Sequence, residues 1–162
     1  MIEKVISGGQ IGADIAALRA AKRVGIETGG FMPLNYMTLE GPRPEYADQY
    51  GMWYTSQATY PPRTRFNVQN SDGTLRFATN WLSPGERCTF RYISQLDKPF
   101  YDVDPNSITD IESELMGVRS WIVKNDIKVL NVAGNAEKRM EPFVEYFMEK
   151  LLARRRYADP GD

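Results

Sequence analysis

Short apolar segments and longer amphipathic segments alternate along this chain. Four segments are short and mostly apolar, as buried strands are: residues 3–7, 75–78, 99–103 and 127–132. Four longer segments show helical spacing of apolar residues or helix-start signals: residues 13–24, 83–96, 107–124 and 140–155. Strands that alternate with helices predict an α/β domain, in which helices cover both faces of a mostly parallel sheet.

Residues 26–66 break this alternation, because glycine and proline pairs interrupt them and aromatic residues are interleaved. We therefore expect an irregular insertion, rich in aromatic residues and proline, over residues 35–62. A structureless stretch of this length is unusual in a small domain unless it forms a binding surface. The segment is predicted to be a lid over a ligand or an interface with another subunit. The alternative is a cap whose aromatic side chains only pack on the core.

The length of 162 residues fits a single domain that spans residues 1–162. Twenty basic and 21 acidic residues give a net charge of −1, which argues against binding to nucleic acid or to an anionic membrane. No apolar run approaches the roughly 18 residues that a membrane span needs. With one thiol and no signal peptide, the chain is expected to be cytoplasmic.

The sequence has no histidine, and its one cysteine is Cys88. A histidine general base, a His-ligated zinc site, an internal disulfide and a Cys₄ metal site are therefore excluded within one chain. Any chemistry must come from carboxylates, lysine, arginine, hydroxyls, backbone amides or a bound ligand. We expect no metal ion that the protein ligates directly.

Three polar loops with small residues are expected at the carboxyl ends of the predicted strands. They are Ser7–Gly12, then Ser71–Thr74 or the residues just after Ala78, and Ala133–Asn135. Ligands of parallel sheets bind beyond these ends of the strands. The loops therefore predict a ligand site.

The first loop, SGGQIGAD at residues 7–14, joins a strand directly to a helix. Its glycines allow backbone amides to approach a ligand, and the start of the helix favours an anion. Gln10 adds a side-chain amide, and Asp14 lies in the first helical turn. The spacing matches neither a P-loop nor a GxGxxG fingerprint. The alternative is a tight turn with a capping carboxylate.

The segment RTRFNVQNSDGT at residues 63–74 adds positive charge before a second polar loop. Arg63 and Arg65 are suited to holding a phosphate or carboxylate. Asp72-Gly73 equally fits a hairpin turn without a function. Cys88 lies near the start of the next predicted helix, where the pKa of a thiol can be lowered. The alternative is a small buried cysteine.

Several of these segments, taken in order, resemble one known family. They are SGGQIGADIAAL at 7–18, TGGFMP at 28–33, EGPR at 40–43, RTRFNVQNSDGT at 63–74 and LNVAG at 130–134. The chain is similar to the molybdenum-cofactor carrier family, which is a YpsA-like, circularly permuted branch of the LOG-like (lysine-decarboxylase-like) Rossmann superfamily. The resemblance spans nearly the whole chain.

This resemblance implies a three-layer Rossmann-like fold that binds a phosphorylated, nucleotide-like or pterin ligand such as molybdenum cofactor (molybdopterin). It also implies a homo-oligomer, either a dimer or a tetramer. By matched position, the implied binding residues are Ser7, Gly8, Gly9, Gln10, Gly12 and Asp14 in the first loop, Arg63, Asn67, Ser71, Asp72, Gly73 and Thr74 on the opposing wall, and Ala133, Gly134 and Asn135 on the third side.

Two departures from the family pattern bear on the ligand. Such members usually have Thr where this chain has Ile11, so one hydroxyl contact is missing. A glycine-rich GGT turn is replaced by SPGERCT at residues 83–89, which adds the carboxylate of Glu86. Both departures suggest altered ligand contacts.

The sequence favours a binding protein, since binding needs only amides, arginines and hydroxyls. The enzymatic alternative is a nucleoside-monophosphate phosphoribohydrolase, as in the LOG-like relatives. That reaction needs a carboxylate beside the ribose, from Asp14 or Glu86, and Arg63 near the phosphate. A sensor that sequesters a nucleotide signal is a third hypothesis.

Overall fold

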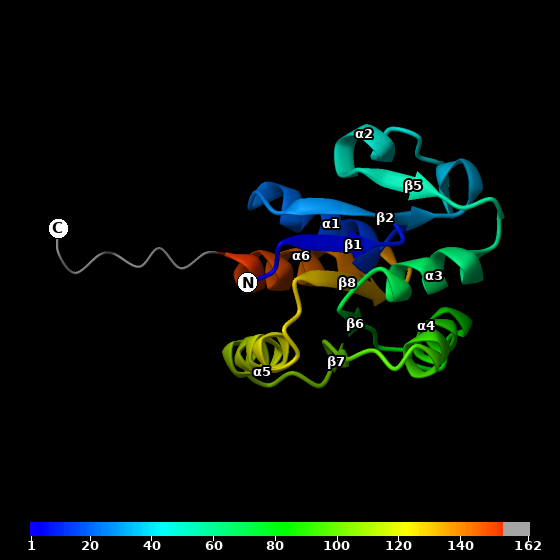
Figure 1. The fold of residues 1–162 in the computed structure, drawn as a ribbon. Helices are drawn as coiled ribbons and strands as arrows, with labels where there is room; N and C mark the ends of the chain where they lie inside the picture. The colour runs from blue at the N-terminus through cyan, green and yellow to red at the C-terminus, as the bar shows by residue number, and fades with distance from the viewer. Residues whose placement is uncertain (154–162) are drawn as a thin grey trace.

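Six parallel strands form the central sheet of the computed structural model, which describes residues 1–153 (Figure 1). In spatial order they are β5 (Met52–Tyr54), β2 (Glu27–Met32), β1 (Lys4–Ser7), β8 (Val129–Gly134), β6 (Gly73–Phe77) and β7 (Phe100–Val103). Every neighbouring pair is parallel. The prediction of a mostly parallel α/β sheet is confirmed.

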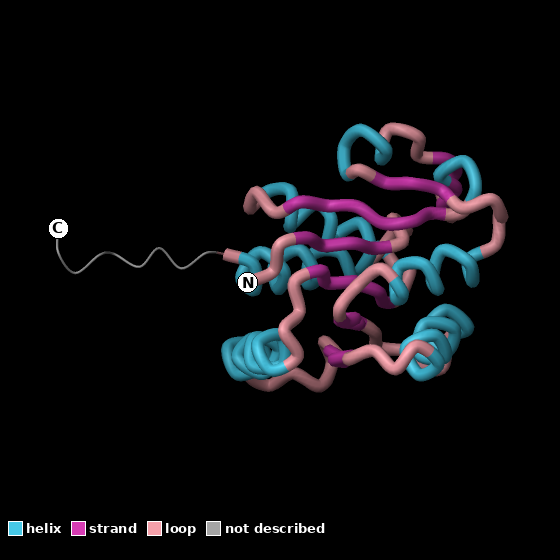
Figure 2. The backbone as a smooth tube through the Cα atoms, viewed as in Figure 1, coloured by secondary structure: helices cyan, strands magenta, loops and turns pink. Residues whose placement is uncertain are grey.

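Helices cover both faces of the sheet, which gives three layers (Figure 2). One face carries α1 (Ala13–Arg23), α5 (Ile111–Lys124) and α6 (Glu141–Leu152), which share one hydrophobic core with the strands. The other face carries α3 (Tyr60–Gln69) and α4 (Pro84–Gln95), which pack against each other. Right-handed crossovers account for this division. The connection through α1 leads from β1 to β2, and the connection through α4 leads from β6 to β7, which is the opposite direction across the sheet.

The segment over residues 35–62 contains short elements rather than an irregular chain. They are η1 (Leu34–Tyr36), the antiparallel pair β3 (Met37–Thr38) and β4 (Gly41–Pro42), α2 (Tyr46–Tyr50) and β5. β2 and α3 flank them. The prediction of an irregular stretch over residues 26–66 is therefore wrong for β2 and β5, which belong to the central sheet, and for α3.

Two features of the sequence concealed these elements. Gly30 interrupts the apolar pattern of β2, yet a Cβ there would lie 2.0 Å from the Ser7 carbonyl oxygen of β1, so the close approach of the two strands requires glycine. Pro61-Pro62 resembles a loop signal, but the prolines lie in the first turn of α3, where proline is tolerated.

The other predicted elements are present with shifted ends. α4 begins directly after Ser83, whose hydroxyl accepts a hydrogen bond from the Glu86 amide as an N-cap. α5 begins later than predicted, because the carboxylate of Asp110 caps it. α6 ends at Leu152, and the predicted continuation to residue 155 lies mostly outside the described residues. Within residues 1–153, no helix is long and apolar enough to cross a membrane.

The strand order places three loops together. β1, β8 and β6 are neighbours, and their carboxyl ends lead into α1, η2 (Lys138–Met140) and α4. α1 and α4 leave this edge toward opposite faces of the sheet, which makes it the topological switch point where ligands of such folds bind.

Candidate functional site

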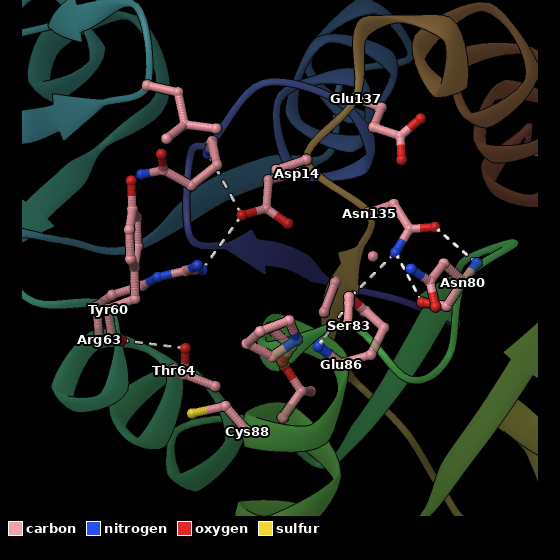
Figure 3. A pocket seen from close by; sticks show the side chains of 18 of the residues that line it. Asp14, Tyr60, Arg63, Thr64, Asn80, Ser83, Glu86, Cys88, Asn135 and Glu137 are labelled. Atoms are coloured by element: carbon pink, nitrogen blue, oxygen red, sulfur yellow. Dashed lines mark hydrogen bonds and ion pairs between the residues drawn. The ribbon is translucent and has the colours of Figure 1, made fainter.

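A cavity of about 600 Å³ lies at this edge, between the ends of the central strands and helices α3 and α4 (Figure 3). Its size is within the usual range for small-molecule sites. Its wall is formed by Gln10, Asp14, Leu39, Tyr60, Pro61, Arg63, Thr64, Asn80, Ser83, Pro84, Gly85, Glu86, Cys88, Thr89, Ala133, Gly134, Asn135, Ala136 and Glu137. Six of the residues predicted from sequence to bind a ligand meet here: Gln10, Asp14, Arg63, Ala133, Gly134 and Asn135.

Asp14 lies buried in the first turn of α1 and holds the glycine loop in place. Its Oδ2 accepts hydrogen bonds from the Gln10 amide and from Arg63 Nη1, both at 3.3 Å. Burial raises the pKa of the Asp14 carboxyl, while the positive charge of Arg63 opposes that rise. Asp14 and Arg63 therefore form a buried ion pair on the wall of the cavity.

Arg63 reaches this pair from α3 across the glycine turn. A Cβ at Gly8 would lie 1.7 Å from Arg63 Nη1, so the absence of a side chain at Gly8 makes room for the guanidinium group. The guanidinium also stacks over the ring of Tyr60, 5.2 Å from its centroid. The predicted proximity of Arg63 to the first loop is thus present in the structure.

Glu86 lies in the first turn of α4 and is 3% exposed. Its Oε2 accepts hydrogen bonds from Ser83 Oγ and from Asn135 Nδ2, each at 3.4 Å. Burial, and then the negative charge of Asp14, raise the pKa of the Glu86 carboxyl to about 7, against the opposing charge of Arg76. Glu86 is therefore protonated more readily than an ordinary glutamate.

Asn135 connects two of the three loops. Its Oδ1 accepts hydrogen bonds from the amides of Thr79 and Asn80 at 2.9 and 3.2 Å, and its Nδ2 also donates to the Asn80 carbonyl at 3.2 Å. The residues after β8 thereby fix the residues after β6. This network gives the cavity a rigid floor.

Three buried side-chain atoms within the described residues have no hydrogen-bond partner, and all three belong to residues that line the cavity. They are Gln10 Oε1, Arg63 Nε and Glu86 Oε1. The orientation of the Gln10 amide is fixed, because its Nε2 donates to the carbonyls of Gly8 and Met37 at 3.3 and 3.0 Å. Unpaired buried polar groups are rare in folded proteins because they are costly.

The glycine loop does not present a set of free backbone amides to an anion. The Gly9 amide donates to Ser7 Oγ at 3.2 Å, and the Gly12 amide donates to Glu141 Oε2 at 3.2 Å. Ser7 Oγ in turn donates to the Asp14 carbonyl. Several amides that the sequence suggested for phosphate binding therefore already have protein acceptors.

The second predicted loop lies at the other end of the sheet. Ser71–Thr74 precedes and opens β6, and the Asp72 carboxylate accepts the amides of Lys128 and Val129 at 3.0 and 2.8 Å. Gly73 packs against Trp121 and Ile127. The placement of this loop at a carboxyl end of the sheet is wrong, because β6 follows the loop instead of leading into it. The alternative, the residues just after Ala78, is correct.

Asn67 also lies away from the cavity wall. Its side chain accepts from the Phe31 amide at 2.9 Å and donates to the Phe31 carbonyl at 3.1 Å, which fastens α3 to β2. Thr74 Oγ1 accepts from Asn131 Nδ2 between neighbouring strands. These predicted residues serve packing of the sheet in this structure.

Three residues of the cavity wall were not singled out as ligand-binding residues from the sequence: Tyr60, Asn80 and Ser83. Tyr60 lies in the segment 35–62, predicted as a lid or an interface, Asn80 follows Ala78, where the alternative loop was expected, and Ser83 carried a helix-start pattern. Cys88 lines the cavity half-buried, and burial raises the pKa of its thiol. This direction agrees with the alternative of a buried cysteine, and not with a thiol pKa that the start of α4 lowers.

Comparisons with known proteins agree with the fold and with the resemblance noted from sequence. A search of curated proteins found no match. The chain is similar to a crystal structure described as "Putative molybdenum carrier protein" from Syntrophus aciditrophicus SB, with 36% identity, a TM-score of 0.81, and coverage of 93% of this chain and 92% of that one. The model of the circularly permutated YpsA SLOG family matches residues 5–155. The chain therefore belongs to the circularly permuted YpsA family of SLOG proteins.

Proposed function

We propose that this protein binds a small phosphorylated ligand, nucleotide-like or pterin, in the cavity at the carboxyl edge of the sheet. The observation that carries the proposal is that all three unpartnered buried side-chain atoms of residues 1–153 belong to residues that line the cavity. Two of them are acceptors and one is a donor, so a ligand that carries both donors and acceptors satisfies all three. Burying a polar atom without a partner costs about 1–3 kcal/mol, which the ligand's hydrogen bonds offset.

The phosphate is best accommodated beside Arg63. Arg63 lines the cavity, its Nε has no hydrogen-bond partner among the described residues, and a guanidinium group binds phosphate with charge-assisted hydrogen bonds. The first turn of α4 also lines the cavity, but it carries the carboxyl group of Glu86, which repels an anion. The proposed phosphate position thus depends on Arg63 of α3 more than on the glycine loop or the start of α4.

A carrier role is supported by the similarity to the putative molybdenum carrier protein of Syntrophus aciditrophicus. Within residues 1–153, no group of three or more His, Cys, Asp or Glu side chains could hold a metal ion. A molybdenum cargo would therefore be held by the sulfur atoms of molybdopterin, while the protein contacts the pterin and the phosphate. A cavity of about 600 Å³ suits a ligand of that size.

One observation favours the enzymatic alternative, hydrolysis of the N-glycosidic bond of a nucleoside monophosphate. Glu86 has a pKa of about 7 and lies in the same cavity as Asp14 and Arg63, so it could act as a general acid. Release of free base, abolished in Glu86→Gln and Asp14→Asn, would favour this reaction over a carrier or a nucleotide sensor.

The direct test is native mass spectrometry of the purified protein, followed by a thermal-shift screen of nucleoside monophosphates and phosphorylated pterins. We expect a retained small mass or a shift of several degrees with one ligand class. Binding without product over hours supports carriage or sequestration. Absence of any bound mass and of any shift contradicts the proposal.

We also propose a homo-oligomer, with the edge of the sheet at β5 as its interface. Trp53 on β5 is 70% exposed, and Phe31, its register partner on β2, packs against the exposed ring of Phe66 on α3. Large exposed aromatic groups are enriched in interfaces. In this proposal the segment over residues 35–62 serves both roles, since Leu39, Tyr60 and Pro61, which belong to it, line the cavity. Sedimentation of the native protein and of Trp53→Ser tests the interface.

A further inference from the structure

Glu86 is the least expected residue of the cavity wall. It is 3% exposed, and its Oε1 has no hydrogen-bond partner within the described residues. A buried carboxyl group normally has every oxygen paired. The free oxygen therefore needs an explanation that the fold does not supply.

Two side chains direct hydrogen-bond donors at one oxygen of Glu86. Asn135 Nδ2 and Ser83 Oγ both donate to Oε2. Asn135 is held in this orientation by the two amides that donate to its Oδ1. Oε1 therefore remains the unpaired oxygen of a residue that lines the cavity, and it can accept a hydrogen bond from a ligand.

Charge then determines which part of a ligand Glu86 contacts. Asp14 and Glu86 repel a phosphate group, whereas Arg63 attracts one. A phosphorylated ligand therefore orients with its phosphate near Arg63 and with a neutral, donor-bearing part near Glu86.

We propose that Glu86 is a specificity-determining residue, which selects ligands that present N–H or O–H donors on the part remote from their phosphate. The proposal rests on the proposed function, since it assumes that a phosphorylated ligand enters this cavity. Two sources share this chemistry. One is an amino or ring N–H of a guanine or pterin, and the other is a hydroxyl group of a ribose; either can donate to the single free oxygen of Glu86.

The experiment is a calorimetric titration of the native protein at pH 8 with four probes: guanosine, inosine and 2′-deoxyguanosine 5′-monophosphates, and neopterin monophosphate. Inosine lacks the amino group and deoxyguanosine lacks the 2′-hydroxyl, so the two comparisons distinguish the sources. The same titrations are made with Glu86→Gln, which keeps the size of the side chain and removes its charge. Glu145→Gln is the matched control, because Glu145 is a partly buried carboxylate that does not line the cavity.

We expect Glu86→Gln to weaken binding of the preferred probe tenfold or more. The differences in affinity among the four probes should also be smaller than in the native protein. Glu145→Gln should stay within about twofold of native affinity. Thermal denaturation of Glu86→Gln verifies that the variant is folded.

Two results would overturn the inference, and they are distinguishable. Native-like affinity and preference in Glu86→Gln, or an equal loss for every probe, removes Glu86 as a selecting residue while the proposed function stands. No binding of any probe by the native protein contradicts the proposed function, and the inference fails with it.

Discussion

The two ends of the sheet carry polar loops that look similar in sequence but differ in how their polar groups are satisfied. At the amino end, the Asp72 carboxylate accepts two backbone amides, and the carbonyl of Ser71 accepts from Lys98 Nζ at 2.8 Å. At the carboxyl end, Gln10, Arg63 and Glu86 each keep a buried atom without a partner. A polar loop that satisfies the backbone is structural, and one that leaves buried groups unpaired is a candidate for ligand binding.

The difference arises from the direction of the chain. Parallel strands bring helix starts to their carboxyl ends, so α1 and α4 place Asp14 and Glu86 beside the cavity. At the amino ends of the strands, the chain arrives from the preceding helices, and short polar side chains stabilise the turns there. The predictions below test this contrast, from the largest expected effect to the smallest.

The largest expected effect is that of Glu86→Gln on the pH dependence of the free energy of unfolding. The folded protein raises the pKa of Glu86 from 4.5 to about 7, so it prefers the protonated form. Native stability therefore falls as pH rises from about 4.5 to 7, and this loss is absent in the variant. We expect Glu86→Gln to be more stable than the native protein by about 3 kcal/mol at pH 8 and equally stable near pH 4. Urea unfolding at both pH values measures this. Equal stability at pH 8 would show that the carboxylate is well solvated or paired.

Arg63→Gln should weaken binding of a nucleoside monophosphate by roughly a hundredfold, because a buried charge-assisted contact to phosphate is lost. Arg65→Gln is the matched control, since Arg65 is exposed on the same helix and does not line the cavity. Calorimetry of both variants compares them. If the two have the same affinity, Arg63 does not hold the phosphate.

Gly8→Ala should weaken binding by about tenfold without unfolding the protein. The new Cβ would meet the flexible end of Arg63 at 1.7 Å and Asp14 Oδ2 at 2.8 Å, so the guanidinium group must move. Circular dichroism verifies the fold, and titration with the same nucleotide measures the loss. Native affinity would mean that the position of Arg63 is unimportant for the ligand.

Asp72→Ala should lower the free energy of unfolding by about 1 kcal/mol and leave ligand affinity unchanged. Its carboxylate is exposed, so water replaces much of what Lys128 and Val129 lose. Chemical denaturation and titration give the two quantities. A marked loss of affinity would place the amino end of the sheet in the site after all.

The sequence predicted those parts of the fold that local patterns determine. Alternating apolar runs and helical spacing gave the parallel sheet, and the Ser83 cap located the start of α4. β2 was missed because Gly30 is required by the neighbouring backbone of Ser7, which no local pattern shows. Close approach of distant segments is visible only in three dimensions.

The candidate site was predicted in part for the same reason. Gln10, Asp14 and Asn135 follow strands whose ends were recognised, and they line the cavity. The loop at Ser71–Thr74 was placed at the wrong end of the sheet because α3 was not predicted. This loop connects α3 to the amino end of β6. Glu86 was noticed as an extra carboxylate, but its burial and its free oxygen required the tertiary structure.

The most direct test of the central claim is an amide chemical-shift titration of ¹⁵N-labelled protein with guanosine 5′-monophosphate. The account predicts shifts that saturate at Gln10, Gly85–Glu86 and Asn135, and no shifts at Asp72–Thr74. Shifts concentrated at Asp72–Thr74, or none at the carboxyl edge of the sheet, would contradict it.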